Sequence, residues 1–396
     1  MLRSYGGACG PSYHGVGRIE MPRVLVTGGA GFIGSHTVDA LLARGYDVRV
    51  LDLLVPPVHN GQVPEYLPKE VEFIKGDVRD RESMRRALRD VHVVYHMAAY
   101  QDYLPDFSTF FTTNAGSTAL LYELIVAEFR MVQLVVVASS QAVYGEGRHD
   151  CSLDGPVYPG PRSEEQLQRG QWEHACPKCG GRLEPGWTDE STMEPHNAYG
   201  LSKRDQDDIG LKIGRRYGVP SVALRYSIVQ GPRQSFCNAY SGALRSFTVQ
   251  LGAKTRPIVY EDGLQLRDYV GVRDVVRATL LPLDCSGMAY RSYNVGGDRS
   301  VIVLELAGLV AKAVGVDLAP EIAGLYRVGD TRHIRSDVSA LARHGWQAKQ
   351  SLEDAVRSYT SWALASPGFH NAAKEAHRRM RELGVLKGVT GAAPRT

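Results

Sequence analysis

Tyr199 and Lys203 are the two residues of this chain whose types and spacing best suit acid–base chemistry. A phenol and an ammonium four residues apart on a helix lie on the same face. A phenol with a pKa of about 10 is a poor base at neutral pH, but a cation one turn away favours the phenolate. Ser140 follows an apolar run at 134–138, and a hydroxyl at the end of such a strand can share a substrate proton. We therefore predict a catalytic group of Ser140, Tyr199 and Lys203, with Tyr199 as the proton acceptor.

The tyrosine–lysine spacing alone means little, because it also arises by chance on solvated helix faces. A glycine-rich turn upstream gives it meaning. An apolar strand expected at 23–26 leads through this turn into a helix expected at 31–44. The helix N-terminus and the missing side chains would form a cradle for a pyrophosphate. The residues expected to contact a dinucleotide here are Gly28, Gly31, Phe32, Ile33 and Gly34.

Asp52 indicates which dinucleotide binds. It ends a strand expected at 47–51, 18 residues beyond Gly34. A carboxylate there can accept hydrogen bonds from the adenosine ribose and repel a 2'-phosphate, which favours NAD over NADP. Glycine triplets often serve only helix–strand packing, but strand, glycines, helix, strand and acid in this order predict a dinucleotide site. The positive nicotinamide of NAD would further favour the phenolate of Tyr199.

Length and composition exclude several classes of protein. The chain has 396 residues, 43% of them hydrophobic and 22% charged, so it can bury one large core or two smaller ones. The net charge of +3 is spread along the chain, without the interleaved basic and aromatic residues of a nucleic-acid surface. No apolar run reaches the roughly 18 residues of a membrane span, and the N-terminus lacks a secretory signal's apolar core. We expect a cytoplasmic enzyme without nucleic-acid or membrane partners.

Short apolar runs alternate with longer amphipathic stretches, which predicts an α/β fold with a doubly wound parallel (Rossmann) sheet. Further strands are expected at 71–75, 91–96, 134–138 and 222–226. After residue 225, glycine and proline break the pattern, which predicts a smaller, interleaved substrate domain. The expected organisation is a disordered tail at 1–20, an NAD-binding domain at 21–224 with an insertion at 146–190 and a returning segment near 268–296, a substrate domain at 225–267 and 297–370, and a C-terminal helix and tail at 371–396.

A series of ordered motifs between Met21 and Trp362 resembles the extended short-chain dehydrogenases/reductases of the NAD-dependent epimerase/dehydratase family. The motifs are Thr27–Gly34, Gly76–Val78, His96–Ala99, Asn114 with Gly116–Thr118, Ser139–Gly145, Leu224–Tyr226, Gly231–Arg233, Arg267–Val270, Tyr293–Gly297 and Arg332–His333. The resemblance implies NAD as the cofactor, a nucleotide-diphosphate sugar as the substrate, and a homodimer. The further cofactor-binding residues that it implies are Asp77, Val78, Ala98, Ala99, Asn114, Tyr199 and Lys203.

The residues after Ser140 distinguish reactions within the family. Sugar-nucleotide 4,6-dehydratases carry an Asp-Glu pair there as acid and base, whereas this chain has Gln141 and Ala142. The resemblance is therefore closer to nucleotide-sugar 4-epimerases. It implies that Tyr199 takes the proton of the sugar O4 while the C4 hydride passes to NAD, and that a transient 4-keto sugar turns over in the pocket. An oxidoreductase or ketoreductase acting on a sugar nucleotide or antibiotic precursor is the alternative, and a non-catalytic scaffold is a third hypothesis.

The nucleotide half of such a substrate needs cationic partners for its diphosphate. The arginines that serve this purpose in the family map onto Arg267 and Arg332, and Arg233 is either a further contact or a surface charge. Many members have an asparagine that touches the sugar nucleotide where this chain has the run beginning at Ser227, and Asn238 is a nearby substitute. The expected substrate-binding residues are Gln141, Arg233, Asn238, Arg267 and Arg332.

The segment between Tyr144 and Tyr199 is longer than usual for the family and contains a zinc-knuckle sequence, Cys-Pro-Lys-Cys-Gly. The expected ligands of a structural zinc are Cys151, Asp154, Cys176 and Cys179, with His149 and His174 as rivals for the fourth position. A loop of reduced thiols is the alternative. Because the segment lies between the catalytic serine and tyrosine, we expect it to form part of the wall or lid over the sugar.

A similar Cys-rich insertion occurs in family members that resemble dTDP-L-rhamnose 4-epimerases, which gives a subtype expectation for this chain. The remaining cysteines, Cys9, Cys237 and Cys285, are scattered along the sequence. We expect them to be ordinary thiols.

Overall fold

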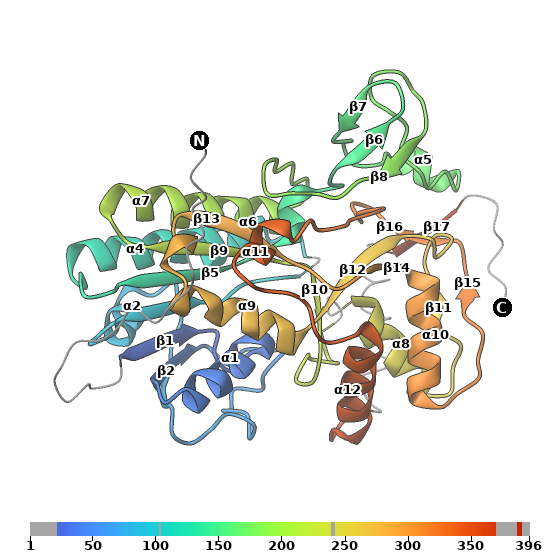
Figure 1. Cartoon of the computed structure of the whole chain (residues 1–396). Coiled ribbons are helices and arrows are strands. Elements are labelled where there is room, and N and C mark those ends of the chain that lie inside the picture. The colour runs from blue at the N-terminus through green and yellow to red at the C-terminus, as the bar shows by residue number, and fades with distance from the viewer. Residues whose placement is uncertain (1–21, 103, 239–241, 370–385, 390–396) are drawn as a thin grey trace.

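Seven parallel strands form the central sheet in the described part of the computed structural model (Figure 1). In sheet order they are β13 (Arg291–Val295), β9 (Ser221–Tyr226), β5 (Leu134–Ser140), β4 (Val93–His96), β1 (Arg23–Thr27), β2 (Asp47–Asp52) and β3 (Glu72–Lys75). In β1, Val24 and Val26 pack into the core on one face and Leu25 on the other, and all three are fully buried. A parallel sheet buried on both faces requires such continuous apolar strands. The predicted fold class is confirmed.

Helices cover both faces of this sheet. On one face, α1 (Phe32–Ala43) and α9 (Val272–Asp284) share a core with β1 and β2. The opposite face carries α2 (Arg81–Ala87), α3 (Phe107–Phe110), η1 (Phe111–Gly116), α4 (Ser117–Ala127), α6 (Ala198–Asp208), η3 (Ile209–Ile213) and α7 (Gly214–Tyr217). The strand order reverses between β1 and β4, and ligands of doubly wound folds bind at the carboxyl ends of strands beside such a reversal.

A second, smaller core lies beside the sheet. Its helices α8 (Gly242–Gly252), α10 (Val303–Val314) and α12 (Leu352–Ala365) share one hydrophobic cluster. Its strands are β10 (Ile228–Gln230), β12 (Leu266–Gly271) and β14 (Ser300–Ile302) in one sheet, β11 (Ile258–Val259) with β15 (Glu321–Ile322), and β16 (Leu325–Arg327) with β17 (Leu386–Gly388). The short helices η2 (Gln141–Tyr144), η5 (Ser286–Met288) and α11 (Ser339–Ala342) complete the body. Elements of the two cores alternate along the chain.

The insertion forms a small antiparallel sheet that projects from the body, at the top right of Figure 1. Its elements are β6 (His149–Cys151), β7 (Gly155–Val157), α5 (Glu164–Gln168) and β8 (Leu183–Pro185). Cys151, Val157, Cys176 and Leu183 form a separate hydrophobic cluster of buried residues there. The insertion therefore has its own small core.

The structure describes residues 22–102, 104–238, 242–369 and 386–389. The predicted tail at 1–20 and the helix predicted at the start of 371–396 lie outside this part. Gly388, within the predicted C-terminal helix and tail, pairs with Leu325 in the β16–β17 ladder. Among the described helices, none is long and apolar enough to cross a membrane.

Candidate active site and metal centre

The glycine turn after β1 leaves no room for side chains. Gly28 has a φ of +68°, and a Cβ atom there would lie 2.7 Å from the backbone nitrogen of Ala98. At Gly34 a Cβ would lie 2.2 Å from the carbonyl oxygen of Gly28. The first turn of α1 is therefore packed directly on the loop, with its N-terminus facing the carboxyl edge of the sheet. This arrangement can cradle the pyrophosphate of a dinucleotide.

Asp52 lies at the end of β2, beside this turn. Its carboxylate accepts hydrogen bonds from the backbone nitrogens of Ala30 at 3.1 Å and Leu54 at 2.9 Å. The side chain is only partly buried. Its position next to the cradle is the one that a ribose-binding carboxylate requires.

The other predicted cofactor residues have different surroundings. Asp77 pairs with Arg79 at 2.6 Å, and Val78 is buried. Asn114 is fully buried, and its amide bonds the backbone nitrogen and oxygen of Tyr100 and the hydroxyl of Ser202. It thus links the loop after β4 to α6 and has no side-chain surface for a ligand. Ala98, next in the same loop to Ala99, makes the close approach to Gly28.

Ser140 and Tyr199 line one cleft of about 750 Å³ together with the first residues of α1, Gly31, Phe32 and Ile33. Asn197 caps α6 by accepting a hydrogen bond from the backbone nitrogen of Gly200 at 2.8 Å, which fixes the start of the helix that carries Tyr199. Burial raises the pKa of Tyr199 to about 12, and a hydrogen bond with Ser140 opposes that rise. The geometry brings the predicted proton acceptor, its hydroxyl partner and the cradle to one space.

Lys203 is buried on the same helix, with its Nζ 5.8 Å from the centre of the Tyr199 ring. Nζ donates to the carbonyl of Ala138 and to the side-chain oxygen of Gln206, both at 2.8 Å. Burial lowers the pKa of Lys203 to about 7, against the attraction of Asp207. Burial of both side chains thus opposes the phenolate of Tyr199. The predicted phenolate, which also depends on the positive nicotinamide of NAD, stays a prediction.

The structure places only some of the predicted substrate residues in the cleft. Gln141, Asn238 and Arg267 line the cleft. Arg233 pairs with Asp39 at 2.7 Å, its guanidinium lies over a tyrosine ring, and it is not part of the cleft lining. We therefore interpret Arg233 as a structural charge.

Arg332 is also absent from the cleft lining, because it is fully buried. Carboxylates of Glu173, Glu261 and Asp262 occupy its guanidinium nitrogens. Its charge is thus neutralised inside the protein, and its assignment to a substrate diphosphate is corrected.

Two cleft arginines were missed from the sequence, Arg245 and Arg327. Arg327 ends β16 and donates to the carboxylate of Asp330 at 2.7 Å. No local pattern in the sequence distinguishes it from Arg332, five residues later. Ser227, the first residue of the run that replaces the family's asparagine-containing segment, is bonded to Asp268 and Ser336 at 2.8 Å, so its hydroxyl is already engaged.

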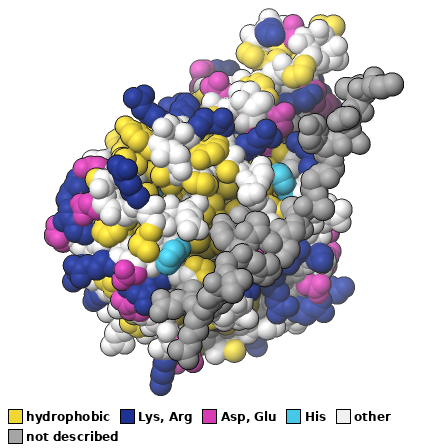
Figure 2. All heavy atoms as spheres, turned by 60° about the vertical axis from the view of Figure 1, so that its left-hand side comes forward, with side chains coloured by type: hydrophobic (Ala, Val, Ile, Leu, Met, Phe, Trp, Pro, Cys, Tyr) yellow, Lys and Arg dark blue, Asp and Glu magenta, His cyan; other side chains and the backbone are white. Residues whose placement is uncertain are grey.

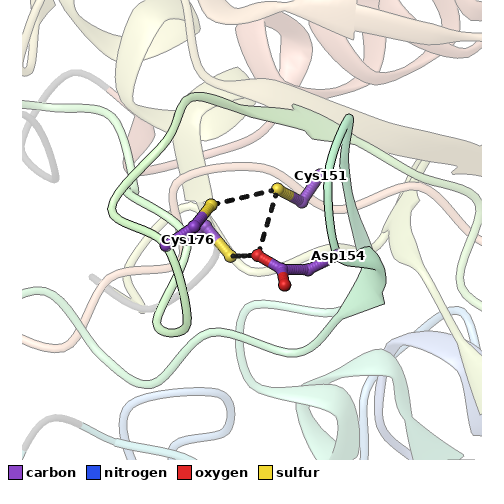
Figure 3. A group of neighbouring side chains, drawn as sticks. Cys151, Asp154 and Cys176 are labelled. Carbon is purple, nitrogen blue, oxygen red and sulfur yellow. Dashed lines mark hydrogen bonds between the residues drawn. The ribbon is translucent and has the colours of Figure 1, made fainter.

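Cys151, Asp154, Cys176 and Cys179 converge in the insertion, with their ligand atoms within 4.8 Å of one another. Figure 3 shows the cysteine thiols and the Asp154 carboxylate pointing toward one another. Sγ of Cys151 lies 3.5 Å from Sγ of Cys179, and Sγ of Cys176 lies 3.2 Å from the carboxylate of Asp154. The two rival histidines turn elsewhere, His174 toward Glu146 and His149 toward the carbonyl of Gly147. The donor set of three sulfurs and one carboxylate oxygen suits a tetrahedral metal ion.

The insertion itself does not line the cleft. The lining includes Gly145 but no residue of 146–190, all of which the structure describes. The expectation of a wall or lid is therefore wrong. Of the other cysteines, Cys237 is free as expected, whereas Cys285 is disulfide-bonded.

Comparisons with known proteins agree with this geometry. Residues 24–164 and 177–296 match the model of the NAD dependent epimerase/dehydratase family. The chain is 31% identical to the dTDP-L-rhamnose 4-epimerase of Burkholderia thailandensis over 87% of this chain and 95% of that protein. A structure of UDP-glucose 4-epimerase with UDP-glucose from Thermotoga maritima matches with a TM-score of 0.70 at 28% identity, over 86% of this chain and 98% of that one. A dTDP-glucose 4,6-dehydratase from Streptomyces venezuelae, with NAD and TYD bound, also gives 0.70, at 26% identity over 89% of this chain and 100% of that one. This chain belongs to the NAD-dependent epimerase/dehydratase family.

Proposed function

We propose that this protein is an NAD-dependent nucleotide-sugar 4-epimerase. The observation that carries the proposal is the single cleft that joins the glycine cradle, the Ser140–Tyr199 pair and the arginines Arg267 and Arg327. Gln141 and Ala142 follow Ser140, so this position supplies no carboxylate for eliminating water. Both the 4-epimerase relatives and the dehydratase share the fold, and this difference favours epimerisation.

In this proposal NAD, Tyr199 and Ser140 have separate functions in the reaction. NAD, held by the cradle and Asp52, would accept the hydride from the sugar C4 and return it to the opposite face. Tyr199 would take the proton of the sugar O4, with Ser140 holding the same oxygen. A cationic cofactor ring beside Tyr199 would lower its pKa from the raised value, since an opposite charge favours the phenolate.

The charged end of the cleft supports a nucleoside diphosphate as the other half of the substrate. Arg267 and Arg327 lie in the lining, and guanidinium groups form charge-assisted, often bidentate, bonds to phosphates. Gln141, which follows the catalytic serine, and Asn238, which follows β10 in the sequence, also line the cleft. They are the proposed contacts to the sugar. The 31% identity to a dTDP-L-rhamnose 4-epimerase favours a deoxythymidine nucleotide.

A panel of UDP-, dTDP-, GDP- and CDP-sugars incubated with the purified protein tests the function. We expect inverted C4 signals by NMR with no net consumption of added NADH. Stoichiometric use of NADH would instead support the ketoreductase alternative. No reaction with any sugar, by a protein that binds partner proteins through its insertion, would support the scaffold.

Replacing Asp52 with alanine is expected to weaken NAD binding about tenfold and to relax discrimination against NADP, because two ribose hydrogen bonds and a repulsive charge are lost. Fluorescence titration with both dinucleotides measures this. Asp47→Ala, at the exposed start of the same strand, is the control. Unchanged affinities in the Asp52 variant would place this carboxylate away from the ribose.

We further propose that the insertion holds one structural zinc ion through Cys151, Asp154, Cys176 and Cys179. A tetrahedron with zinc–sulfur bonds of about 2.3 Å separates its ligand atoms by roughly 3.5–3.8 Å. The separations here, such as the 3.6 Å between Cys151 Sγ and the Asp154 carboxylate, need only small adjustments. All four positions are filled by protein atoms, so the ion would have no open site for catalysis.

Protein purified without chelators is expected to contain close to one equivalent of zinc, and Cys176→Ser is expected to lose it and melt at a lower temperature. The reason is that binding at a structural site is linked to folding. Plasma emission spectrometry and calorimetry measure the two effects. Cys237→Ser, at a free and exposed cysteine outside the cluster, should change neither. Zinc-free wild-type protein would leave the insertion as a loop of reduced thiols.

A homodimer and a cytoplasmic location complete the proposal. Figure 2 shows hydrophobic side chains gathered on the face that lies to the left in Figure 1, and the exposed apolar residues include Met131 and Tyr217, near the ends of α4 and α7. The cysteines of the insertion form no disulfide, which suits a reducing compartment, whereas the disulfide-bonded Cys285 is unusual there. Sedimentation equilibrium and cell fractionation test the two expectations.

A further inference from the structure

Two charged side chains of the insertion reach into the body of the protein, although the proposed reaction uses neither. Arg162 donates to both carboxylate oxygens of Glu261 at 2.9 Å and to the carbonyl of Asp330 at 2.8 Å. Its side chain and that of Glu261 are 1% and 2% exposed. This is a buried, bidentate contact between the insertion and the second core.

Glu173 makes the other contact. One of its oxygens accepts from the guanidinium of Arg332 at 3.0 Å, and the second lies 2.9 Å from Nε2 of His333. The backbone nitrogen of Arg332 also donates to Glu146, at the root of the insertion, at 2.7 Å. Burial opposes the ionisation of Glu173, but its bonds to His333 and Arg332 lower its pKa to about 2, so it is a carboxylate at any working pH.

These contacts hold residues 330–332. The same segment accepts hydrogen bonds from the two cleft arginines, Arg267 and Arg327. Arg267 donates to the carbonyls of Thr331 at 2.6 Å and Arg332 at 2.9 Å. Arg327 donates to the carboxylate of Asp330. The positions of both guanidinium groups in the cleft thus depend on where this segment lies.

Glu173 is also close to the metal cluster, three residues before Cys176. Between them, Ala175 bridges to Arg182, and the backbone nitrogen of Cys176 bonds Gly181 at 2.7 Å. A metal ion that fixes Cys176 would therefore restrain the short segment 173–176 that presents Glu173.

We propose that the insertion is a brace for the diphosphate site: through Glu173 and Arg162 it positions the segment 330–332, and thereby Arg267 and Arg327, without touching the substrate. The inference rests on the proposed function, because it assumes that the cleft binds a nucleoside diphosphate. Glu173 and Arg162 are positioning residues in this scheme. Metal in the cluster and nucleotide in the cleft are then coupled, with each favouring the binding of the other.

Glu173→Gln is the sharpest test, because the Glu173 side chain is 56% exposed and its loss leaves the buried Arg162–Glu261 pair intact. We expect the dissociation constants of dTDP and UDP, measured by calorimetry on protein with its NAD and metal, to rise about three- to tenfold. KM for the sugar nucleotide should rise in parallel, while kcat and bound NAD stay within about twofold. Glu165→Gln, at an exposed i, i+4 pair with Arg169 in the same insertion, is the matched control and should change nothing.

Two comparisons separate positioning from general damage. Glu173→Asp keeps the charge and is expected to recover part of the affinity, so equal losses in both variants would overturn the proposal. Removing the metal with a chelator should weaken dTDP binding by the wild type. In Glu173→Gln it should cause little further loss of affinity, because the metal acts on the diphosphate site through Glu173. Equal effects of the chelator on both proteins, or unchanged binding in Glu173→Gln, would overturn the brace alone. Failure of the wild type to bind either nucleotide would overturn the proposed function, and the brace with it.

Discussion

Replacing Tyr199 with phenylalanine is expected to lower the rate of epimerisation by a factor of about 10² to 10⁴, the usual contribution of a positioned acid–base group. The phenyl ring keeps its packing on α6 and loses only the hydroxyl that bonds Ser140. NAD binding should be unchanged, because the substitution leaves the glycine cradle and Asp52, the proposed NAD contacts, in place. The C4 inversion rate by NMR and the NAD content of the purified protein measure the two effects.

Tyr217→Phe, at an exposed tyrosine on α7, is the control for the loss of a phenol as such. If Tyr199→Phe retained activity within about threefold of the wild type, Tyr199 would not be the proton acceptor. A parallel loss of NAD would instead indicate damage to the fold around α6.

Replacing Arg327 with glutamine is expected to raise KM for the sugar nucleotide by a factor of about 10 to 100, since hydrogen bonds to charged groups contribute about 1.5–3 kcal/mol. Turnover at saturation should change less, because the diphosphate lies away from the reacting carbon. Initial rates over a range of substrate concentrations separate the two parameters.

Arg233→Gln provides the matched control, because this arginine pairs with Asp39 outside the cleft. It is expected to leave KM unchanged. The opposite result, with a raised KM in Arg233→Gln and none in Arg327→Gln, would restore the interpretation made from the sequence and remove Arg327 from the site.

The sheet could be predicted from the sequence because its strands are short apolar runs whose burial on both faces leaves little choice of pattern. β2 and β9 begin and end within one or two residues of expectation, and β5 extends two residues further, through Ser140. The glycine turn was equally accessible, since its spacing reflects contacts within one strand–turn–helix unit. Part of the cysteine cluster follows the same rule, because local spacing brings Cys176 and Cys179 together.

The arginines were less predictable, because their function depends on which charges the fold places around them. Arg332 and Arg327 are five residues apart in the sequence, yet one is enclosed by carboxylates and the other opens to the cleft. Likewise, the phenolate of Tyr199 was predicted from the nearness of Lys203 and the nicotinamide, whereas burial raises the pKa of Tyr199 and lowers that of Lys203. Long-range packing of this kind leaves no signal in residue spacing.

The alternation of the two cores along the chain limits how substrate preference can change. The chain leaves the central sheet after β9, returns with α9 and β13, and leaves again at β14. No contiguous segment therefore contains the whole nucleotide-sugar half of the cleft. Exchanging one gene segment between relatives would combine cleft residues that do not fit the same substrate. New specificity in this architecture must arise by individual substitutions along the cleft. The insertion enters and leaves the body near Gly147 and Thr188, but it can be exchanged as one block only if the new block keeps the buried contacts to Glu261 and Arg332.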